Sequence, residues 1–208
     1  MKLRTLFAAS TITLASSAAM ATPALFFLIN GDTFTQPFSI TNQSNANEFV
    51  TRFQLNIAPS GMVFDTVTGG PPNNGTIGVP FTPRGNSAIT TGLVPTFGPA
   101  DGSPLLDISF TDFNSGEVFQ WDIDVDGASG QPITVTGDLL IGSLATIDFS
   151  NGERLFGVLS AVAGNPVASQ FVVTGRGITP TLPEPGSLAL AGLALLAAGV
   201  AHRGAKRA

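Results

Sequence analysis

The stretch LLDISFTDFNSGEVFQWDIDV, residues 105–125, decides the fold. Apolar and polar side chains alternate on both sides of Phe113-Asn-Ser-Gly116, and a period of two is typical of a β-strand buried on one face. We therefore expect a β-hairpin with its loop at 113–116. Its register sets three apolar pairs opposite each other: Phe110 with Phe119, Ile108 with Trp121, and Leu106 with Ile123. Trp121 is thus expected to anchor the core, the alternative being a ring that stacks on a ligand.

Short alternating segments of this kind recur along residues 22–182, separated by turns rich in Gly and Pro. No segment there keeps the period of an amphipathic helix, and this pattern is typical of an all-β domain. We expect a single β-sandwich of the jelly-roll or Ig-like type. Its strands are expected near Leu25–Ile29, Phe34–Thr41, Val50–Ala58, Met62–Thr66, Ala88–Leu93, Leu105–Phe110, Val118–Val125, Ile133–Thr136, Leu144–Phe149, Arg154–Ser160 and Gln170–Thr174.

A second hairpin is expected at Asn151-Gly152, a dipeptide typical of a two-residue type I′ turn. Pairing outward from this turn sets three residues opposite three others: Phe149 with Arg154, Ile147 with Phe156, and Ala145 with Val158. Because two of these pairs are apolar, the face that carries them is predicted to be buried.

Residues 1–21 have the parts of a secretory signal peptide. Lys2 and Arg4 supply the positive start, a mostly apolar run follows, and Ala19-Met20-Ala21 is a small-residue cleavage pattern. We expect signal peptidase to recognise Ala19 and Ala21 and to leave a domain over residues 22–182.

Residues 183–208 combine three features in a fixed order: Pro183-Glu184-Pro185, the apolar run Leu188–Ala201, and a basic end with Arg203, Lys206 and Arg207. A helix over the apolar part, begun at Gly186, would rise about 24 Å. A bilayer core is about 30 Å thick, so this is a marginal transmembrane helix. Positive charge prefers the cytoplasmic side, which sets the domain on the opposite side. The prolines favour an extended segment open to a protease, although an uncleaved single-pass anchor is the alternative.

This tail resembles the C-terminal sorting signal of PEP-CTERM proteins, and the resemblance covers residues 183–208. It implies processing by an exosortase-type membrane protease at or near Pro183-Glu184-Pro185. The precursor would be held in the inner membrane of a Gram-negative bacterium, facing the periplasm. The product would then belong to the cell envelope or the extracellular space, where such proteins accompany exopolysaccharide and biofilm matrix.

Composition excludes several kinds of function. The body carries four arginines against thirteen Asp and Glu (fourteen in the chain, less Glu184), a net charge of −9. Such a surface repels phosphate backbones, so no nucleic-acid partner is expected. The chain has no Cys and no Tyr, and its one His is His202 in the tail. The body therefore lacks the residues of a thiolate site, a Ser-His-Asp triad or a His-ligated zinc site.

Acidic residues are densest in Asp122-Ile-Asp-Val-Asp-Gly127. The hairpin register above also sets Asp107 opposite Asp122, and two like charges across strands are unfavourable unless a cation relieves them. Asp107, Asp122, Asp124 and Asp126 are therefore candidate calcium ligands, and no other cofactor is expected. An EF-hand is excluded, because Ile133 stands where that loop needs its twelfth-position Glu. In the alternative interpretation, the three aspartates of the motif face water while Trp121, Ile123 and Val125 face the core.

These features favour an exported cell-surface or matrix protein with a non-catalytic structural or adhesive role. The alternative is a calcium-assisted carbohydrate-binding module. An enzyme ranks third, and its remaining route is a carboxylate-based glycosidase or lyase that uses Glu117 with Asp112, or the Asp cluster itself.

Overall fold

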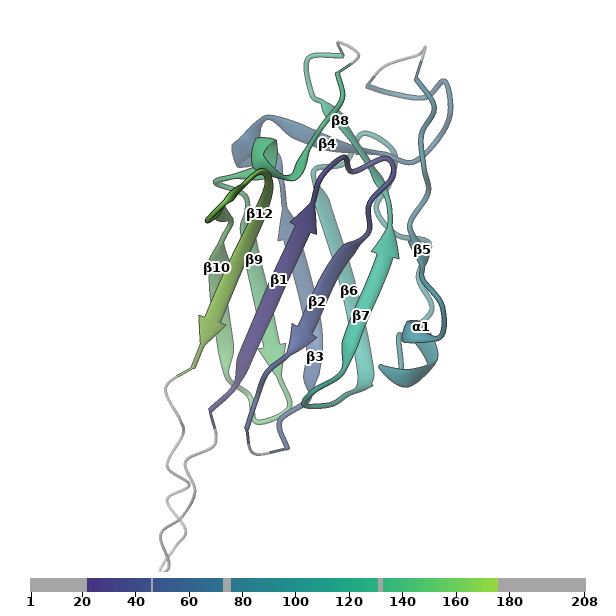
Figure 1. Ribbon diagram of the computed structural model, residues 1–208. Helices are drawn as coiled ribbons and strands as arrows, with labels where there is room; N and C mark the ends of the chain where they lie inside the picture. The colour runs from purple at the N-terminus through teal and green to yellow at the C-terminus, as the bar shows by residue number, and fades with distance from the viewer. Residues whose placement is uncertain (1–21, 46, 73–75, 131–132, 176–208) are drawn as a thin grey trace, which may run out of the picture. The chain divides into compact units, whose positions relative to one another are not determined.

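Alternating apolar side chains build two antiparallel β-sheets that share one core (Figure 1). The computed structural model describes residues 22–45, 47–72, 76–130 and 133–175. The chain divides into two compact units, residues 1–178 and 179–208, and every described residue belongs to the first. The predicted signal peptide with Ala19 and Ala21 lies outside the described residues, and so does the predicted sorting segment 183–208. Within the described part, no helix is long and apolar enough to cross a membrane.

The first sheet has six strands in the order β11-β12-β1-β2-β7-β5. Their bounds are β1 Ala24–Asn30, β2 Phe38–Asn42, β5 Thr82–Pro83, β7 Val118–Asp122, β11 Ser160–Val162 and β12 Asn165–Thr174. The second sheet has four strands in the order β10-β9-β3-β6. They are β3 Val50–Asn56, β6 Leu105–Phe113, β9 Leu144–Phe149 and β10 Arg154–Val158. A separate ribbon pairs β4 Met62–Asp65 with β8 Asp124–Gly127. The helical turns are η1 Ala58–Ser60, α1 Ser87–Thr90 and η2 Gly137–Leu140.

Aromatic rings from both sheets meet in the core. Phe27 of β1 lies 6.1 Å from Phe53 of β3, and Phe53 lies 6.0 Å from Trp121 of β7, measured between ring centroids. Trp121 is fully buried, as are Ile123 and, to within 1%, Val125. The all-β prediction is confirmed, and so is the prediction that Trp121 anchors the core.

The predicted hairpin over residues 105–125 is wrong in its pairing. β6 pairs with β3 and β7 pairs with β2, so the two segments belong to different sheets. The loop between them is tied to β2 instead, because the Asn42 amide donates to the carbonyl of Phe113 at 2.8 Å and the Gly116 N–H donates to the carbonyl of Asn42 at 2.7 Å. Phe110 and Phe119 still meet, with centroids 5.0 Å apart, but across the core and not along one sheet.

The predicted register at Asn151-Gly152 is also wrong. A type I′ turn needs positive φ at both central residues, and of these two only Gly152 has it, at 84°. The loop is therefore one residue longer, with Phe149 and Glu153 joined by a backbone hydrogen bond of 3.0 Å. Leu155 then pairs with Ile147, and Phe156 turns outward with 72% of its surface exposed. Gly157 faces inward instead, where an added Cβ would lie 2.9 Å from the Phe171 ring.

Four other predicted strands are wrong in part. Residues 88–90 belong to helix α1, and residues 133–136 form only an isolated bridge from Thr136 to Asp32. The segment expected as Val118–Val125 splits after Asp122, where the chain leaves the six-stranded sheet and continues as β8. The expected strand Phe34–Thr41 begins only at Phe38, because the Asp32 carboxylate accepts the Phe34 N–H and holds a turn there.

Candidate functional site

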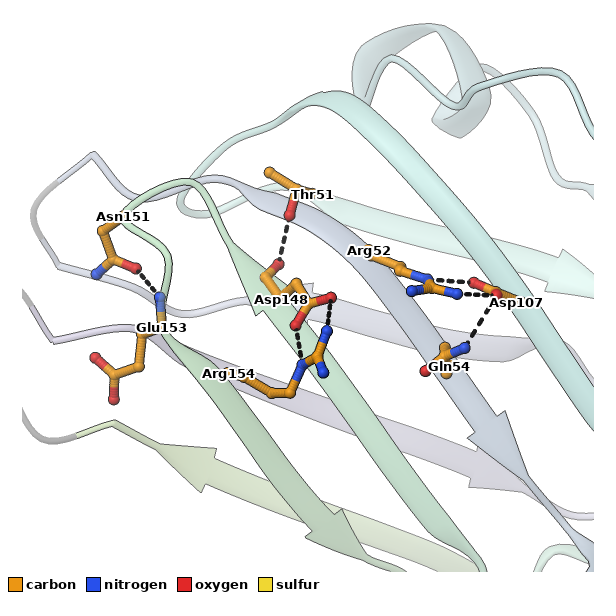
Figure 2. A network of polar contacts seen from close by, with 8 residues as sticks. All are labelled: Thr51, Arg52, Gln54, Asp107, Asp148, Asn151, Glu153 and Arg154. Carbon is orange, nitrogen blue, oxygen red and sulfur yellow. Dashed lines mark hydrogen bonds and ion pairs between the residues drawn. The ribbon is translucent and has the colours of Figure 1, made fainter.

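A row of charged side chains crosses the outer face of the four-stranded sheet (Figure 2). The strand registers set Ser109, Arg52, Asp148 and Arg154 side by side on β6, β3, β9 and β10, and we call these four residues the outer polar row. Arg154 holds Asp148 through two hydrogen bonds of 2.5 and 2.9 Å. Asp107 lies two residues before Ser109 on the same face of β6. It accepts two hydrogen bonds from Arg52 and one of 2.9 Å from the Gln54 amide.

The ion pairs keep these carboxylates charged. The hydrogen bond from Arg52 lowers the pKa of Asp107, and the hydrogen bond from Arg154 lowers the pKa of Asp148. The same bonds raise the pKa of each arginine above its usual value. The outer face thus presents two arginine–carboxylate pairs and the Gln54 amide, and each of these two carboxylates is neutralised by its arginine.

A shallow cleft and an apolar border lie beside the outer polar row. The cleft has a volume of about 430 Å³ and is lined by Arg52, Val94, Pro95, Thr96, Asp107 and Ser109. On the side of β9 and β10, the outward residues become apolar: Leu144, Phe156 and Val158 are 45%, 72% and 56% exposed. Planar polar groups next to an exposed aromatic ring form a surface that can contact both the hydroxyl groups and the apolar faces of sugar rings.

The four predicted calcium ligands do not come together. Asp107 is paired with Arg52 on the four-stranded sheet, and Asp122 is paired with Arg84 at 2.7 Å beside the six-stranded sheet. Asp107 is therefore not opposite Asp122, and the repulsion inferred from that register does not exist. The alternative interpretation is wrong as well for two residues, because Asp124 and Asp126 are buried instead of facing water.

Asp65 lies beside the acidic residues of β8, and the sequence did not predict this contact. It lies directly opposite Asp124 on the β4–β8 ribbon, and Asp126 is two residues further along the same face. We call Asp65, Asp124 and Asp126 the carboxylate cluster. Their exposed fractions are 0%, 6% and 3%. The only signal in the sequence is that Asp65 ends an apolar strand at Met62-Val-Phe-Asp65, which does not reveal its partner.

Burial dominates the electrostatics of the carboxylate cluster. Desolvation raises the pKa of Asp124 to about 7, and the charges of Asp126, Asp65 and Asp32 add to this effect. Desolvation also raises the pKa of Asp65, against a hydrogen bond from Thr76 that lowers it. Among the described residues, no three Asp, Glu or His side chains already stand in an arrangement that holds a metal ion.

The acid and base considered for an enzyme lie at the end of β6, which holds Asp112, and on the loop before β7, which holds Glu117. Glu117 is partly exposed, and its carboxylate accepts the Asn114 N–H at 2.6 Å. Asp112 is exposed, and its carboxylate accepts the Asn114 amide at 2.7 Å. Both carboxylates therefore organise their own turn, and neither of them lines the cleft beside Arg52 or the cavity beside Asp124.

Comparison with known protein families gives a match in the tail of the chain. The family described as the PEP-CTERM protein-sorting motif matches residues 181–203, which include Pro183, Glu184 and Pro185. None of the curated proteins and none of the solved structures matches the chain.

Proposed function

Since the chain is a PEP-CTERM domain-containing protein, whose motif implies an exported, membrane-anchored precursor recognised by an exosortase, we propose that its body is a non-catalytic structural or adhesive element of the extracellular matrix. The body would be a jelly-roll or Ig-like β-sandwich, delivered across the inner membrane by the signal peptide at residues 1–21. It would face the periplasm until processing releases it to the envelope or the medium, where exopolysaccharide and biofilm matrix are the expected surroundings.

The sorting motif is the observation that carries this proposal. The described residues support a non-catalytic role, because the carboxylates of the outer face are already neutralised by arginines and Glu117 and Asp112 serve a turn. The basic residues Arg203, Lys206 and Arg207 support the proposed topology, since positive charge near a membrane segment favours the cytoplasmic side.

Replacing Pro183, Glu184 and Pro185 together by alanine is expected to block processing. The protease would lose the rigid acidic segment that it recognises, and the chain would stay in the membrane fraction with its tail. Intact mass of the protein from native cells and from their medium measures this, and we expect the processed form to fall at least about tenfold. Pro180→Ala is the matched control, since residue 180 lies just before the matched segment. A processed form at the wild-type level in the triple variant would contradict exosortase sorting.

A carbohydrate-binding module, assisted by calcium, is the second candidate function, and the outer face favours it. Arg52 and Asp107 present guanidinium and carboxylate groups along the cleft, the Gln54 amide lies beside them on Asp107, and Phe156 adds an exposed ring on the same sheet. The opposing charges balance within this face, so a neutral or weakly charged polysaccharide fits it better than a strongly anionic one.

Phe156→Ala is expected to weaken glycan binding about tenfold or more, because the alanine variant loses the stacking of the phenyl ring against the apolar face of a sugar. The stacking of a nucleic-acid base on an aromatic side chain, a comparable contact, is worth about 1–3 kcal/mol. The measurement is binding of the full chain in non-ionic detergent to a glycan array, with calcium and with chelator. Val172→Ala is the control, since Val172 is 61% exposed on β12 of the other sheet. Equal loss in both variants, or no binding by the wild type, would remove this candidate.

A further inference from the structure

The carboxylate cluster of Asp65, Asp124 and Asp126 is buried without a cationic side chain. Burying a carboxylate is costly unless the charge is paired or coordinated to a metal. In the part of the chain that the structure describes, Arg52, Arg84 and Arg154 are all paired with other aspartates, and no lysine is present. Nothing in this described part therefore neutralises the cluster.

Two oxygen atoms of the carboxylate cluster also lack a hydrogen-bond donor. They are Asp65 Oδ1 and Asp126 Oδ2, both fully buried. The other Asp65 oxygen accepts the Thr76 hydroxyl at 2.7 Å, and the Asp65 and Asp126 carboxyls lie close enough to interact directly. Two buried carboxyl groups that interact without a donor are favourable only with a proton or a metal ion between them.

Two of the three residues of the carboxylate cluster can be reached from a cavity, whereas Asp65 is fully buried and does not line it. Asp124 and Asp126 line a cavity of about 280 Å³, together with Asp32 and Thr76. This cavity supplies a route for an ion and room for the waters that would complete its coordination. Oxygen ligands alone favour a hard divalent cation.

We propose that Asp65 and Asp126 bind a calcium ion, with Asp124 and the Thr76 hydroxyl as neighbouring oxygen donors. This site goes beyond the proposed function, and it differs from the ligand set expected from the sequence by including Asp65 and leaving out Asp107 and Asp122. Two carboxylates that rely on water for the remaining ligands make a weak site, with a Kd on the order of 10⁻⁴ to 10⁻³ M, as in extracellular modules. Calcium is favoured over magnesium because it tolerates irregular geometry, whereas magnesium demands a near-octahedral shell.

The test is thermal unfolding of the full chain in non-ionic detergent, with chelator and with 5 mM calcium chloride, together with calorimetric titration of calcium alone. We expect calcium to raise the Tm of the wild type by roughly 3–5 °C. Asp126→Asn and Asp65→Asn should abolish both the rise and the binding heat. In chelator, each of these two variants should be at least as stable as the wild type, because it removes a repelling buried charge.

Asp122→Asn is the matched control, since Asp122 lies two residues from Asp124 but pairs with Arg84 on the surface. It should keep the full calcium response. The proposal is overturned if the wild type shows no binding heat and no change in Tm, or if Asp122→Asn loses the response as completely as Asp126→Asn. It is also overturned if magnesium at the same concentration gives an equal rise that survives Asp126→Asn, because that would reflect general screening of an acidic surface.

Discussion

Trp121→Ala is expected to lower the free energy of unfolding by about 4 kcal/mol, within the range of about 3–5 kcal/mol typical of a buried aromatic replaced by alanine. The ring is fully buried, and five aromatic rings lie within 6.5 Å of it, centroid to centroid. These neighbours come from both sheets, so the cavity left by alanine would open where the two layers meet. Urea unfolding of the full chain in non-ionic detergent, followed by circular dichroism, measures the loss.

Phe156→Ala is the control for this substitution. It removes an aromatic side chain of similar size, but one that is 72% exposed on the edge strand β10. We expect a change within about 0.5 kcal/mol, as for most surface positions. If both variants lost the same stability, the core would not depend on Trp121 as the packing indicates.

Raising the pH from 5 to 8 in chelator is expected to destabilise the domain by about 2–3 kcal/mol, because each pH unit between 5 and the folded-state pKa of Asp124 costs about 1.4 kcal/mol and the loss levels off above that pKa. The pKa of Asp124 is about 7 in the folded chain, well above its value of about 3.9 in an unfolded chain. A folded state with a raised carboxyl pKa holds the extra proton below pH 7. The stabilisation is therefore complete below about pH 4 and is lost as the pH rises through 7. Asp65, whose pKa is also raised by burial, acts in the same direction.

Asp124→Asn separates this effect from other titrations. It should flatten the pH dependence between 5 and 8, while Asp122→Asn should leave the slope unchanged. Asp107 and Asp148 act in the opposite direction, because their pKa values are lowered by arginine, and they destabilise the fold only as the pH falls below about 4. Urea unfolding at a series of pH values gives the slope directly. A stability that rises from pH 5 to pH 8 in chelator would contradict the raised pKa of Asp124.

Much of the fold could be predicted from alternation, which reports burial. Trp121, Ile123 and Val125 face the core as the pattern predicts, and the strand Leu144–Phe149 has the predicted bounds. Alternation does not report which strand is the partner. Phe110 and Phe119 can face each other along one sheet or across the core, and the sequence pattern is the same in both cases. The contact that accompanies the observed pairing comes from far away in sequence: the Asn42 amide donates to the carbonyl of Phe113 at the end of β6.

The candidate sites depend on the pairings that sequence could not predict. Asp65 and Asp124 are opposite each other only because β8 leaves the six-stranded sheet and pairs with β4. Arg52 and Asp107 meet because β3 lies beside β6. The density of aspartates near residue 124 did indicate where charge is concentrated, but burial reversed the expected exposure of Asp124 and Asp126.

The outermost strands of the six-stranded sheet are short, which limits aggregation by strand pairing between molecules at high concentration. β11 has three residues and β5 has two, one of them Pro83, which has no N–H to offer. An edge this short gives another chain little backbone to extend, so sheets of neighbouring molecules cannot readily join into fibres along it. Contacts of this sheet with neighbouring molecules would then be made through the side chains on its outer face and not by strand pairing at its edges.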